Sequence, residues 1–236
     1  MLRIQAMNVE LAGNAVLRRM DVLLEAGQTV AVVGRNGAGK TTLLRTIMGL
    51  VSPQSGRLIL DDEDITNSPA YRRAAAGFGY APEDRVILPT LTVAQNITLP
   101  CEVLRVPRHE IQRRVDAVVA SVPQLEPMLP RSGAALSGGQ GKIVALARAL
   151  MVGVRFLLLD EPFQGLAPAL ARQYGDALRA LPLSRPQLCV VVTESNAALL
   201  DGVQSRTLHI ERGEVSEAAT KPLNTIARPS TALHLG

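Results

Sequence analysis

The sequence predicts an α/β protein built around a mainly parallel β-sheet. Three short apolar runs lead to this prediction: "TVAVVG" at residues 29–34, "RFLLLDE" at 155–161 and "QLCVVVT" at 187–193. Their length and branched side chains fit strands that are covered on both faces, and helical stretches lie between them. Buried strands that alternate with helices along a chain are typical of a parallel sheet.

Two further segments complete the predicted architecture. Residues 2–10 and 16–25 alternate polar and apolar side chains on either side of "AGN", which predicts an antiparallel edge sheet at the N-terminus. Between about residues 83 and 131 the strand pattern disappears and prolines cluster, which predicts an inserted helical lobe. Apolar side chains recur in this lobe at helical spacing, namely Ile111, Val115, Val118, Val119 and Val122.

The composition fits a globular chain and argues against several classes of function. The 236 residues are 47% hydrophobic and 19% charged, which is typical of a folded domain. No apolar run approaches the roughly eighteen residues of a spanning helix, and the first residues read as a strand and not as a secretory signal. A net charge of +4 without runs of like charge gives no indication of nucleic acid as a partner. We therefore expect a cytoplasmic protein that does not bind nucleic acid.

A glycine-rich loop follows the first buried strand and precedes a helical segment. Its sequence "GRNGAGKTT" matches the pattern G-x-x-x-x-G-K-[ST] in the structural context that this pattern requires. Its glycines let backbone N–H groups point at phosphate oxygens, where the helix dipole adds to the attraction. Lys40 is expected to bridge the β- and γ-phosphates and Thr41 to bind Mg²⁺. The predicted nucleotide-binding residues here are Gly34, Arg35, Asn36, Gly37, Ala38, Gly39, Lys40, Thr41 and Thr42.

Two acids follow the second buried strand. Asp160 and Glu161 end the run "FLLLDE", and ligands of open α/β sheets bind at the carboxyl ends of the strands. Asp160 is expected to support Mg²⁺, usually through water. Glu161 is expected to orient and polarise the water that attacks the γ-phosphate, as a general base. Acids at strand ends also occur for solubility alone, but the phosphate loop favours the functional interpretation.

A second glycine-rich turn begins the helix of "ALSGGQGKIVALARAL" at residues 135–150. Ser137 and Gln140 form a capping box, which by itself explains a well-started helix. The cap does not require Gly138 and Gly139 in the first turn, where glycine is entropically unfavourable. A helix N-terminus attracts anions. The turn could bind the γ-phosphate of the chain's own nucleotide, but Lys40 already lies at a phosphate-binding helix of its own. The alternative is that the turn faces a nucleotide held by a second chain, turned head to tail.

The order of "GRNGAGKTT", "LSGGQ" and "LLLDEP" resembles that of the ATP-binding cassette family, the ATPase subunits of ABC transporters, over roughly residues 2–215. The resemblance implies a P-loop NTPase core with an N-terminal antiparallel β subdomain and an inserted helical subdomain, and it implies ATP and Mg²⁺ as ligands. It also implies that two subunits close over two ATP molecules. In that arrangement Ser137, Gly138, Gly139 and Gln140 contact the nucleotide on the partner's phosphate loop.

The same resemblance divides the single domain of residues 1–236 into parts. The core with its β subdomain is expected at 1–82 and 152–215, the helical lobe with the signature motif at 83–151, and a C-terminal tail at 216–236. "YAPEDR" and "EPFQGLAP" resemble the ATPases of branched-chain amino acid importers. There Glu83 would sense Mg²⁺ and the γ-phosphate while its loop touches membrane subunits. A solvated loop acid is the alternative for Glu83.

Two positions depart from the family pattern. The family commonly stacks adenine on an aromatic residue near the end of the first strand, where this chain has Leu11 or Ala12. Loss of the π-face lowers ATP affinity by about tenfold at most. After "LCVVVT" the family usually has a histidine that contacts the γ-phosphate; Ser195 best matches that position, with Glu194 as the alternative. We expect slow turnover at this chain's own site, which raises the hypothesis of an unequal pair of subunits.

These features predict an ATPase subunit of an ABC importer that energises uptake of a small solute, of the class of branched-chain amino acids or similar amino acids and amides. The expected partners are a second ABC ATPase subunit, identical or related, two integral-membrane permease subunits and, indirectly, a solute-binding protein, at the inner face of the cell membrane. Two alternatives remain. One is a subunit with weak or no turnover that completes its partner's site, and the other is a non-transport ABC ATPase.

Overall fold

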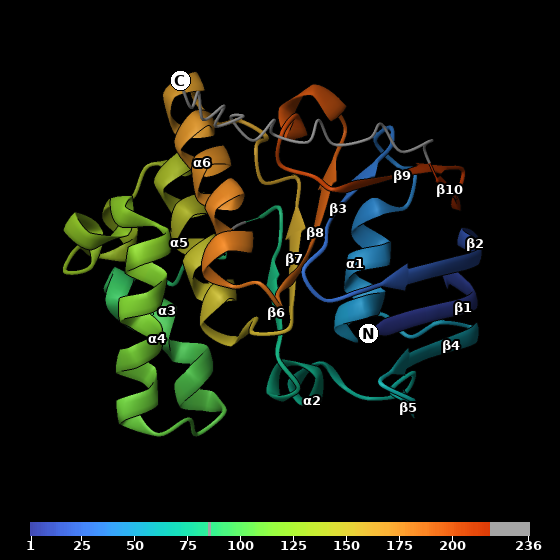
Figure 1. Cartoon of the computed structure of the whole chain (residues 1–236), viewed down its shortest axis with the longest axis horizontal. Coiled ribbons are helices and arrows are strands. Elements are labelled where there is room, and N and C mark those ends of the chain that lie inside the picture. The colour runs from blue at the N-terminus through green and yellow to red at the C-terminus, as the bar shows by residue number, and fades with distance from the viewer. Residues whose placement is uncertain (85, 218–236) are drawn as a thin grey trace, which may run out of the picture.

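The computed structural model describes residues 1–84 and 86–217 of the chain. In this part the larger of two β-sheets has the strand order β10-β9-β3-β8-β7-β6. Its strands are β3 (Thr29–Val33), β6 (Phe78–Ala81), β7 (Phe156–Asp160), β8 (Cys189–Glu194), β9 (Arg206–Glu211) and β10 (Glu214–Glu217). All neighbours are parallel except β9 and β10, which form an antiparallel hairpin. The mainly parallel sheet is confirmed, and the three apolar runs are its adjacent central strands (Figure 1).

The central strands are apolar throughout because both faces of their sheet are covered. Successive side chains of a strand point to opposite faces. In β3, Val30 and Val32 enter one hydrophobic cluster and Ala31 and Val33 enter another. Each face of the sheet therefore has its own covering layer.

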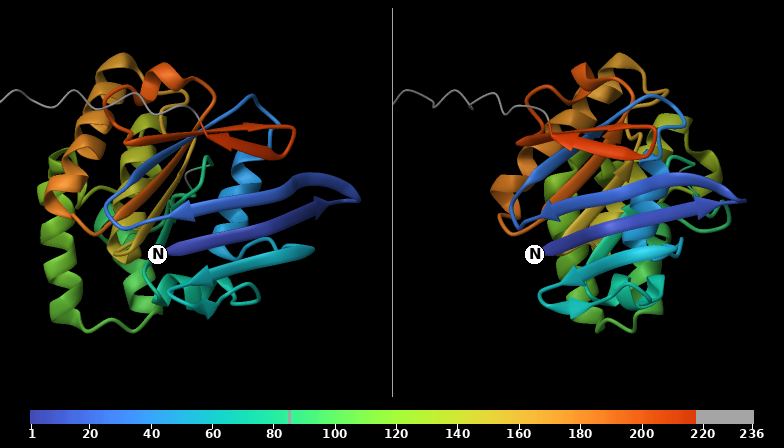
Figure 2. Two further views of the ribbon diagram at one scale, coloured as in Figure 1. Left: turned by 45° about the vertical axis from the view of Figure 1, so that its right-hand side comes forward. Right: turned by 90° about the vertical axis from the view of Figure 1, so that its right-hand side faces the viewer.

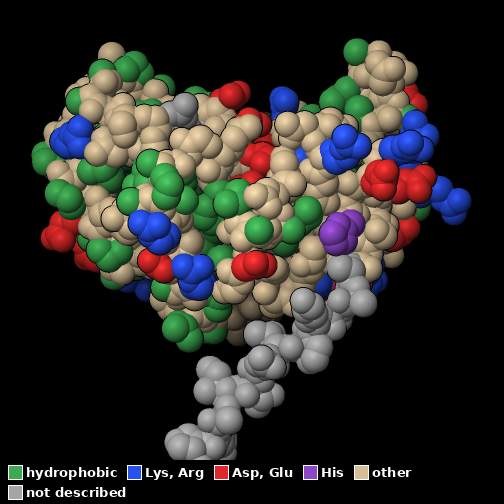
Figure 3. Space-filling view, turned by 90° about the horizontal axis from the view of Figure 1, so that it is seen from above, with side chains coloured by type: hydrophobic (Ala, Val, Ile, Leu, Met, Phe, Trp, Pro, Cys, Tyr) green, Lys and Arg blue, Asp and Glu red, His purple; other side chains and the backbone are tan. Residues whose placement is uncertain are grey.

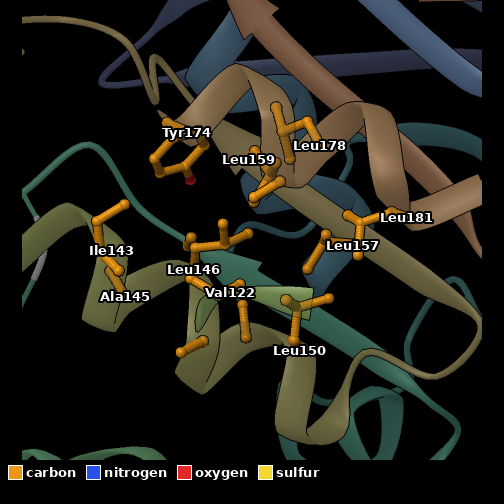
Figure 4. Close-up of a cluster of buried hydrophobic side chains, with 14 of the residues drawn as sticks. Val122, Ile143, Ala145, Leu146, Leu150, Leu157, Leu159, Tyr174, Leu178 and Leu181 are labelled. Atoms are coloured by element: carbon orange, nitrogen blue, oxygen red, sulfur yellow. The ribbon is translucent and has the colours of Figure 1, made fainter. Parts of the chain in front are cut away.

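Helices cover the face of the sheet to which Ala31 and Val33 point (Figure 1). They are α3 (Val93–Val103), α4 (Arg108–Ser121), α5 (Gly138–Val152) and α6 (Pro168–Ser184), with the short 3-10 helices η1 (Pro123–Met128) and η2 (Gly133–Ala135) between α4 and α5. The helices expected between about residues 83 and 131 are thus present. Leu146 and Leu150 of α5 point toward Leu157 and Leu159 of β7 and toward Leu178 of α6 (Figure 4). Helix α5 thereby fixes the start of the second glycine-rich turn relative to the sheet.

Helix α1 (Lys40–Met48) and a second sheet cover the other face. The second sheet has the order β2-β1-β4-β5 and is antiparallel throughout. Its strands are β1 (Leu2–Leu11), β2 (Asn14–Leu24), β4 (Ser55–Leu60) and β5 (Glu63–Asp64). The N-terminal antiparallel segment is confirmed, but it forms a layer of its own and not an edge of the parallel sheet (Figure 2). The reason is its single apolar face: Leu2, Ile4 and Val9 are buried in the cluster that also contains Leu43 and Leu44 of α1.

Strand β6 is a part of the parallel sheet that the apolar pattern did not predict. It is short, and it contains Gly79, which lowers strand propensity. A Cβ atom at Gly79 would collide with the carbonyl oxygen of Ala149 in α5 and lie 2.8 Å from the Cα of Gly153. The glycine is therefore needed for the close approach of α5 to this strand.

The C-terminal tail expected at residues 216–236 is only partly described. Residues 216 and 217 belong to β10, and residues 218–236 lie outside the described residues. Of the helices in the described ranges, none combines the length and the hydropathy that crossing a bilayer requires.

A buried arginine holds the far end of α1. Arg73 lies in α2 (Ala70–Ala75), is 2% exposed, and donates five hydrogen bonds of 2.7–2.9 Å to backbone carbonyl oxygens. Two of these oxygens belong to Thr46 and Ile47 in the last turn of α1, where the helix dipole favours a cation. Burial lowers the pKa of Arg73 to about 10, which leaves the side chain charged at neutral pH. Arg73 thus anchors the helix whose first turn is the phosphate loop.

Replacing Arg73 by leucine should lower the free energy of unfolding by about 3 kcal/mol or more, because several buried carbonyl groups lose their donor. Urea unfolding followed by circular dichroism measures the change. The neighbouring exposed Arg72→Leu is the matched control and should change stability by about 0.5 kcal/mol or less. Equal effects of the two substitutions would contradict the anchoring role of Arg73.

Candidate functional site

A cavity of about 280 Å³ lies at the carboxyl ends of the parallel strands. Figure 3 views this end of the molecule, where acidic side chains lie in a hollow. The lining residues come from β2, the phosphate loop, the loop after β6 and the end of β7: Val16, Asn36, Gly37, Gly39, Lys40, Thr41, Thr42, Glu83, Glu161 and Gln164. The structure therefore brings together most of the phosphate loop, Glu83 and Glu161. The remaining loop residues Gly34, Arg35 and Ala38 line a neighbouring cavity of about 580 Å³ beside β9.

The phosphate loop joins β3 to α1 through left-handed glycines. Gly37 has φ of 80° and Gly39, which caps α1, has φ of 108°. Lys40 is buried, and its Nζ donates to the carbonyl oxygens of Gly34 at 2.7 Å and Arg35 at 3.1 Å. The same Nζ forms an ion pair of 3.0 Å with Oε1 of Glu161. The lysine thus links the loop to the acidic strand end.

Asp160 is held by three hydroxyl groups at the end of β7. Its Oδ1 accepts hydrogen bonds from Oγ1 of Thr193 at 2.7 Å and of Thr41 at 3.2 Å, and its Oδ2 accepts one from Tyr80 at 3.3 Å. Burial and the neighbouring Asp160 raise the pKa of Tyr80, so that it stays a donor. The hydroxyl of Thr41 beside the buried carboxylate is an oxygen donor set that suits Mg²⁺, which takes one or two protein oxygens and completes its shell with phosphate and water.

Glu161 adopts an unusual backbone conformation, with φ of 44°. Its Oε1 accepts a hydrogen bond of 2.7 Å from Oγ of Ser195, and its Oε2 accepts one of 3.2 Å from the backbone N–H of Ser195. Burial opposes ionisation, but hydrogen bonds from Ser195 and Lys40 outweigh it and lower the pKa of Glu161. The carboxylate is therefore ionised and oriented by its neighbours.

Glu194 and Ser195, the two alternatives that the sequence leaves open, point in different directions. Ser195 reaches the phosphate loop, with its Oγ 2.8 Å from Oδ1 of Asn36 and 3.4 Å from Nζ of Lys40. Glu194 is 2% exposed and accepts a hydrogen bond of 2.9 Å from the backbone N–H of Phe163. Burial, together with the carboxylate of Glu161, raises the pKa of Glu194 to about 8. Of the two, Ser195 therefore faces the phosphate loop, and its contact with a γ-phosphate stays a prediction.

The second glycine-rich turn lies outside this cavity. The predicted capping box is present: the N–H of Gln140 donates to Oγ of Ser137 at 3.3 Å, and the N–H of Ser137 donates to Oε1 of Gln140 at 3.0 Å. Ser137 and Gly138 are exposed. A Cβ atom at Gly139 would collide with Cδ2 of Leu170 in α6. Gly139 thus packs against the side chain of Leu170, and contact of the turn with a partner's nucleotide stays a prediction.

Sequence reasoning missed several residues of the site. Tyr80 and Thr193 hold Asp160, and each is the last but one residue of a strand next to β7. Their nearness to Asp160 depends on the strand order, which the sequence does not show. Gln164 lines the cavity from the loop after β7. Val16 lines it from β2, whereas Leu11, 39% exposed, and Ala12 are not among the lining residues. The apolar wall of the cavity is therefore supplied by Val16.

The raised pKa of Glu194 makes stability depend on pH. The folded chain holds a proton on Glu194 between about pH 4.5 and 8 that the unfolded chain has released, so this contribution is complete below about pH 4.5 and is lost as the pH rises through 8. The lowered pKa of Glu161 acts only below its ordinary value of 4.5, outside this window. Urea unfolding from pH 5 to 8.5 should therefore show a loss of stability, at most about 1.4 kcal/mol per pH unit, that Glu194→Gln abolishes. Parallel curves for the two proteins would contradict the assignment.

Comparisons with known proteins agree with this geometry. Residues 17–164 match the family described as ABC transporter. A lipopolysaccharide export system ATP-binding protein of Acidithiobacillus ferridurans is 33% identical over 205 residues, 87% of this chain and 84% of that protein. A putative 2-aminoethylphosphonate import ATP-binding protein of Salmonella choleraesuis (strain SC-B67) is 31% identical over 230 residues, 95% of this chain and 61% of that protein.

A solved structure of a bacterial ABC transporter cassette, in dimeric form, has the same fold. Its TM-score is 0.81 at 21% identity, over 93% of this chain and 98% of that one. The P-loop NTPase fold, with a parallel sheet, an antiparallel layer and helices, is therefore confirmed. With a family match over more than half of its length and a phosphate loop that faces two acids across one cavity, the chain belongs to the ABC transporter family, as an ATP-binding domain.

Proposed function

We propose that this chain is the ATP-hydrolysing subunit of an ABC importer. The observation that supports hydrolysis is the ion pair of 3.0 Å between Lys40 and Glu161, within the cavity that the phosphate loop lines. It places the expected phosphate ligand and the expected general base side by side.

Each residue of the site has a separate role in the proposed reaction. The glycine N–H groups and Lys40 bind the phosphates, and Glu161 accepts the proton of the water that attacks the γ-phosphorus while the bond to the β-phosphate oxygen breaks. When ATP binds, Lys40 gives up its ion pair with Glu161 and pairs with the γ-phosphate instead. The hydrogen bond from Ser195 then keeps the released carboxylate in place. Thr41 and Asp160, with Glu83 nearby, would hold Mg²⁺, which neutralises developing charge on the phosphates.

Replacement of Glu161 by glutamine should lower ATP hydrolysis by about 10²- to 10⁴-fold, because the shape of the site is kept but its base is lost. Phosphate release by the purified chain measures the rate, and equilibrium binding of radiolabelled ATP should stay within a few-fold of wild type. If the wild-type chain hydrolyses ATP no faster than this variant, the enzymatic function is wrong and the binding-only alternative holds.

Replacement of Ser195 by alanine should lower kcat by about tenfold while the KM for ATP changes little. The hydroxyl donates to Glu161 and contacts Asn36, so its loss removes orientation of the base more than binding of the nucleotide. Ser195→Gln keeps a neutral hydrogen-bond donor and should retain more activity than Ser195→Ala. An alanine variant with wild-type kcat would exclude a role for Ser195 in catalysis.

We further propose that two such subunits close face to face, so that the turn at Ser137 meets the partner's nucleotide. The exposure of Ser137 and Gly138 outside their own cavity supports this arrangement, as does the dimeric form of the cassette that shares the fold. The subunit pair would act at the inner face of the cell membrane with two permease subunits.

Import of a small solute is the finer part of the proposal. It is supported by the likeness of "YAPEDR" and "EPFQGLAP" to amino acid importers and by the import protein of Salmonella, while the relative from Acidithiobacillus is named for export. Neither relative's name mentions an amino acid, so that solute class is supported by the two segments alone. Reconstitution of the chain in vesicles with its co-purifying membrane proteins tests it: ATP-dependent uptake of leucine is expected, and uptake of 2-aminoethylphosphonate in its place would redirect the assignment.

A further inference from the structure

A buried lysine links the second glycine-rich turn to the proposed base. Lys142 is the fifth residue of α5, counted from Gly138, and is only 8% exposed. Its Nζ donates a hydrogen bond of 2.6 Å to the backbone carbonyl oxygen of Glu161. The helix that carries the turn is thereby bonded directly to the residue at the reacting end of β7.

The side chain of Lys142 lies where four elements meet under the site. The small space around it is lined by Pro82 at the start of the loop that carries Glu83, by Asp160 and Pro162 around the end of β7, and by Tyr174 of α6. In Figure 4 the neighbouring Ala145 of α5 and Tyr174 of α6 lie on the same side of the core. Lys142 therefore bonds α5 to the end of β7 and shares a small space with the start of the loop that carries Glu83.

A buried cation at this position is energetically unfavourable if its only role is to fill space. Burial of an ammonium group is energetically unfavourable unless nearby charges and hydrogen bonds offset the loss of hydration. Here Asp160 lines the same small space, and the charge of Lys142 acts on the carboxylate of Glu194. The residues that follow Lys142 in α5, Ile143 and Val144, are buried and apolar, so an apolar side chain would pack here without that cost.

The bond from Lys142 holds the carbonyl group of Glu161, whose backbone has an unusual conformation. Glu161 has φ of 44°, a left-handed conformation that is sterically unfavourable for a residue other than glycine. Its N–H is held by Oγ1 of Thr193 at 3.1 Å and the carbonyl oxygen of Thr193 at 3.2 Å, and its C=O is held by Lys142. With both ends of the residue fixed, the carboxylate has little freedom to leave the cavity.

We propose that Lys142 is a positioning residue for ATP hydrolysis, which holds the backbone of Glu161 in its left-handed conformation and so keeps the carboxylate directed at the attacking water. This inference rests on the proposed function, because it assigns Lys142 a role through the base. It differs from the roles of Lys40 and Ser195, which contact the carboxylate itself.

The test compares Lys142→Met, Lys142→Arg and Arg57→Met in the full chain. Methionine fills a similar volume but cannot donate, arginine keeps charge and donors, and Arg57 is an exposed arginine of β4 that serves as the control. We expect Lys142→Met to lower kcat for ATP by about 10- to 100-fold, since displacement of a reacting group by about 1 Å costs rates of that order. The KM and the equilibrium binding of ATP should stay within about threefold, and Lys142→Arg should recover most of the loss.

Two results would overturn the inference: a kcat of Lys142→Met equal to that of Arg57→Met, or a loss of activity in Lys142→Met that comes with an equal loss of ATP binding. A cooperative thermal unfolding transition is measured for each variant, and if Lys142→Met does not fold, Lys142→Arg decides alone: an arginine variant that folds and binds ATP but lacks turnover contradicts the role. Failure of the proposed function would give a different result: the wild-type chain itself would hydrolyse ATP no faster than Glu161→Gln.

Discussion

The ion pair between Lys40 and Glu161 is the interaction on which the site depends. Both side chains are buried, so each charge would be costly without the other. A γ-phosphate offers Lys40 a second anionic partner in the same cavity, and therefore the lysine can change partners without being exposed to water. Glu161 then keeps the two hydrogen bonds from Ser195 as its compensation. In the proposed mechanism, nucleotide binding therefore also frees Glu161 from Lys40.

The pairing of the parallel strands determines which residues can meet. Val33 pairs with Glu194 in β8, and Asp160 of β7 pairs with Thr193 in β8, so the three strands end at the same level. Asp160 is the last residue of β7, and the phosphate loop, Glu161 and Ser195 each follow directly after the end of one of these strands. A slip of one residue would turn Asp160 to the opposite face of the sheet. The two-sided burial of β3, β7 and β8 prevents such a slip, and the hydrophobic clusters therefore fix the chemistry as well as the fold.

The sequence predicted the parts of the site that follow from local patterns. The phosphate loop, the acids after "FLLLD" and the capping box at Ser137 all depend on residues close together in the chain, and each is where it was expected. The separate antiparallel layer, strand β6 and the partners of Asp160 depend on strand order and on close approaches such as that of Gly79 to α5. Those are long-range properties of the packed chain. Val16 was missed for the same reason, since nothing near it in sequence marks it as a cavity wall.

The two glycine-rich turns of the chain present their helices differently. At α1 the start of the helix is buried, and Lys40 occupies the space in front of it. At α5 the capping box engages the N–H groups of Ser137 and Gln140, and not those of the two glycines between them. An anion that approached α5 from outside would therefore meet glycine amides while the cap stays formed. Because Lys142 bonds the same helix to Glu161, any shift of α5 on such an encounter would act on the backbone of the proposed base.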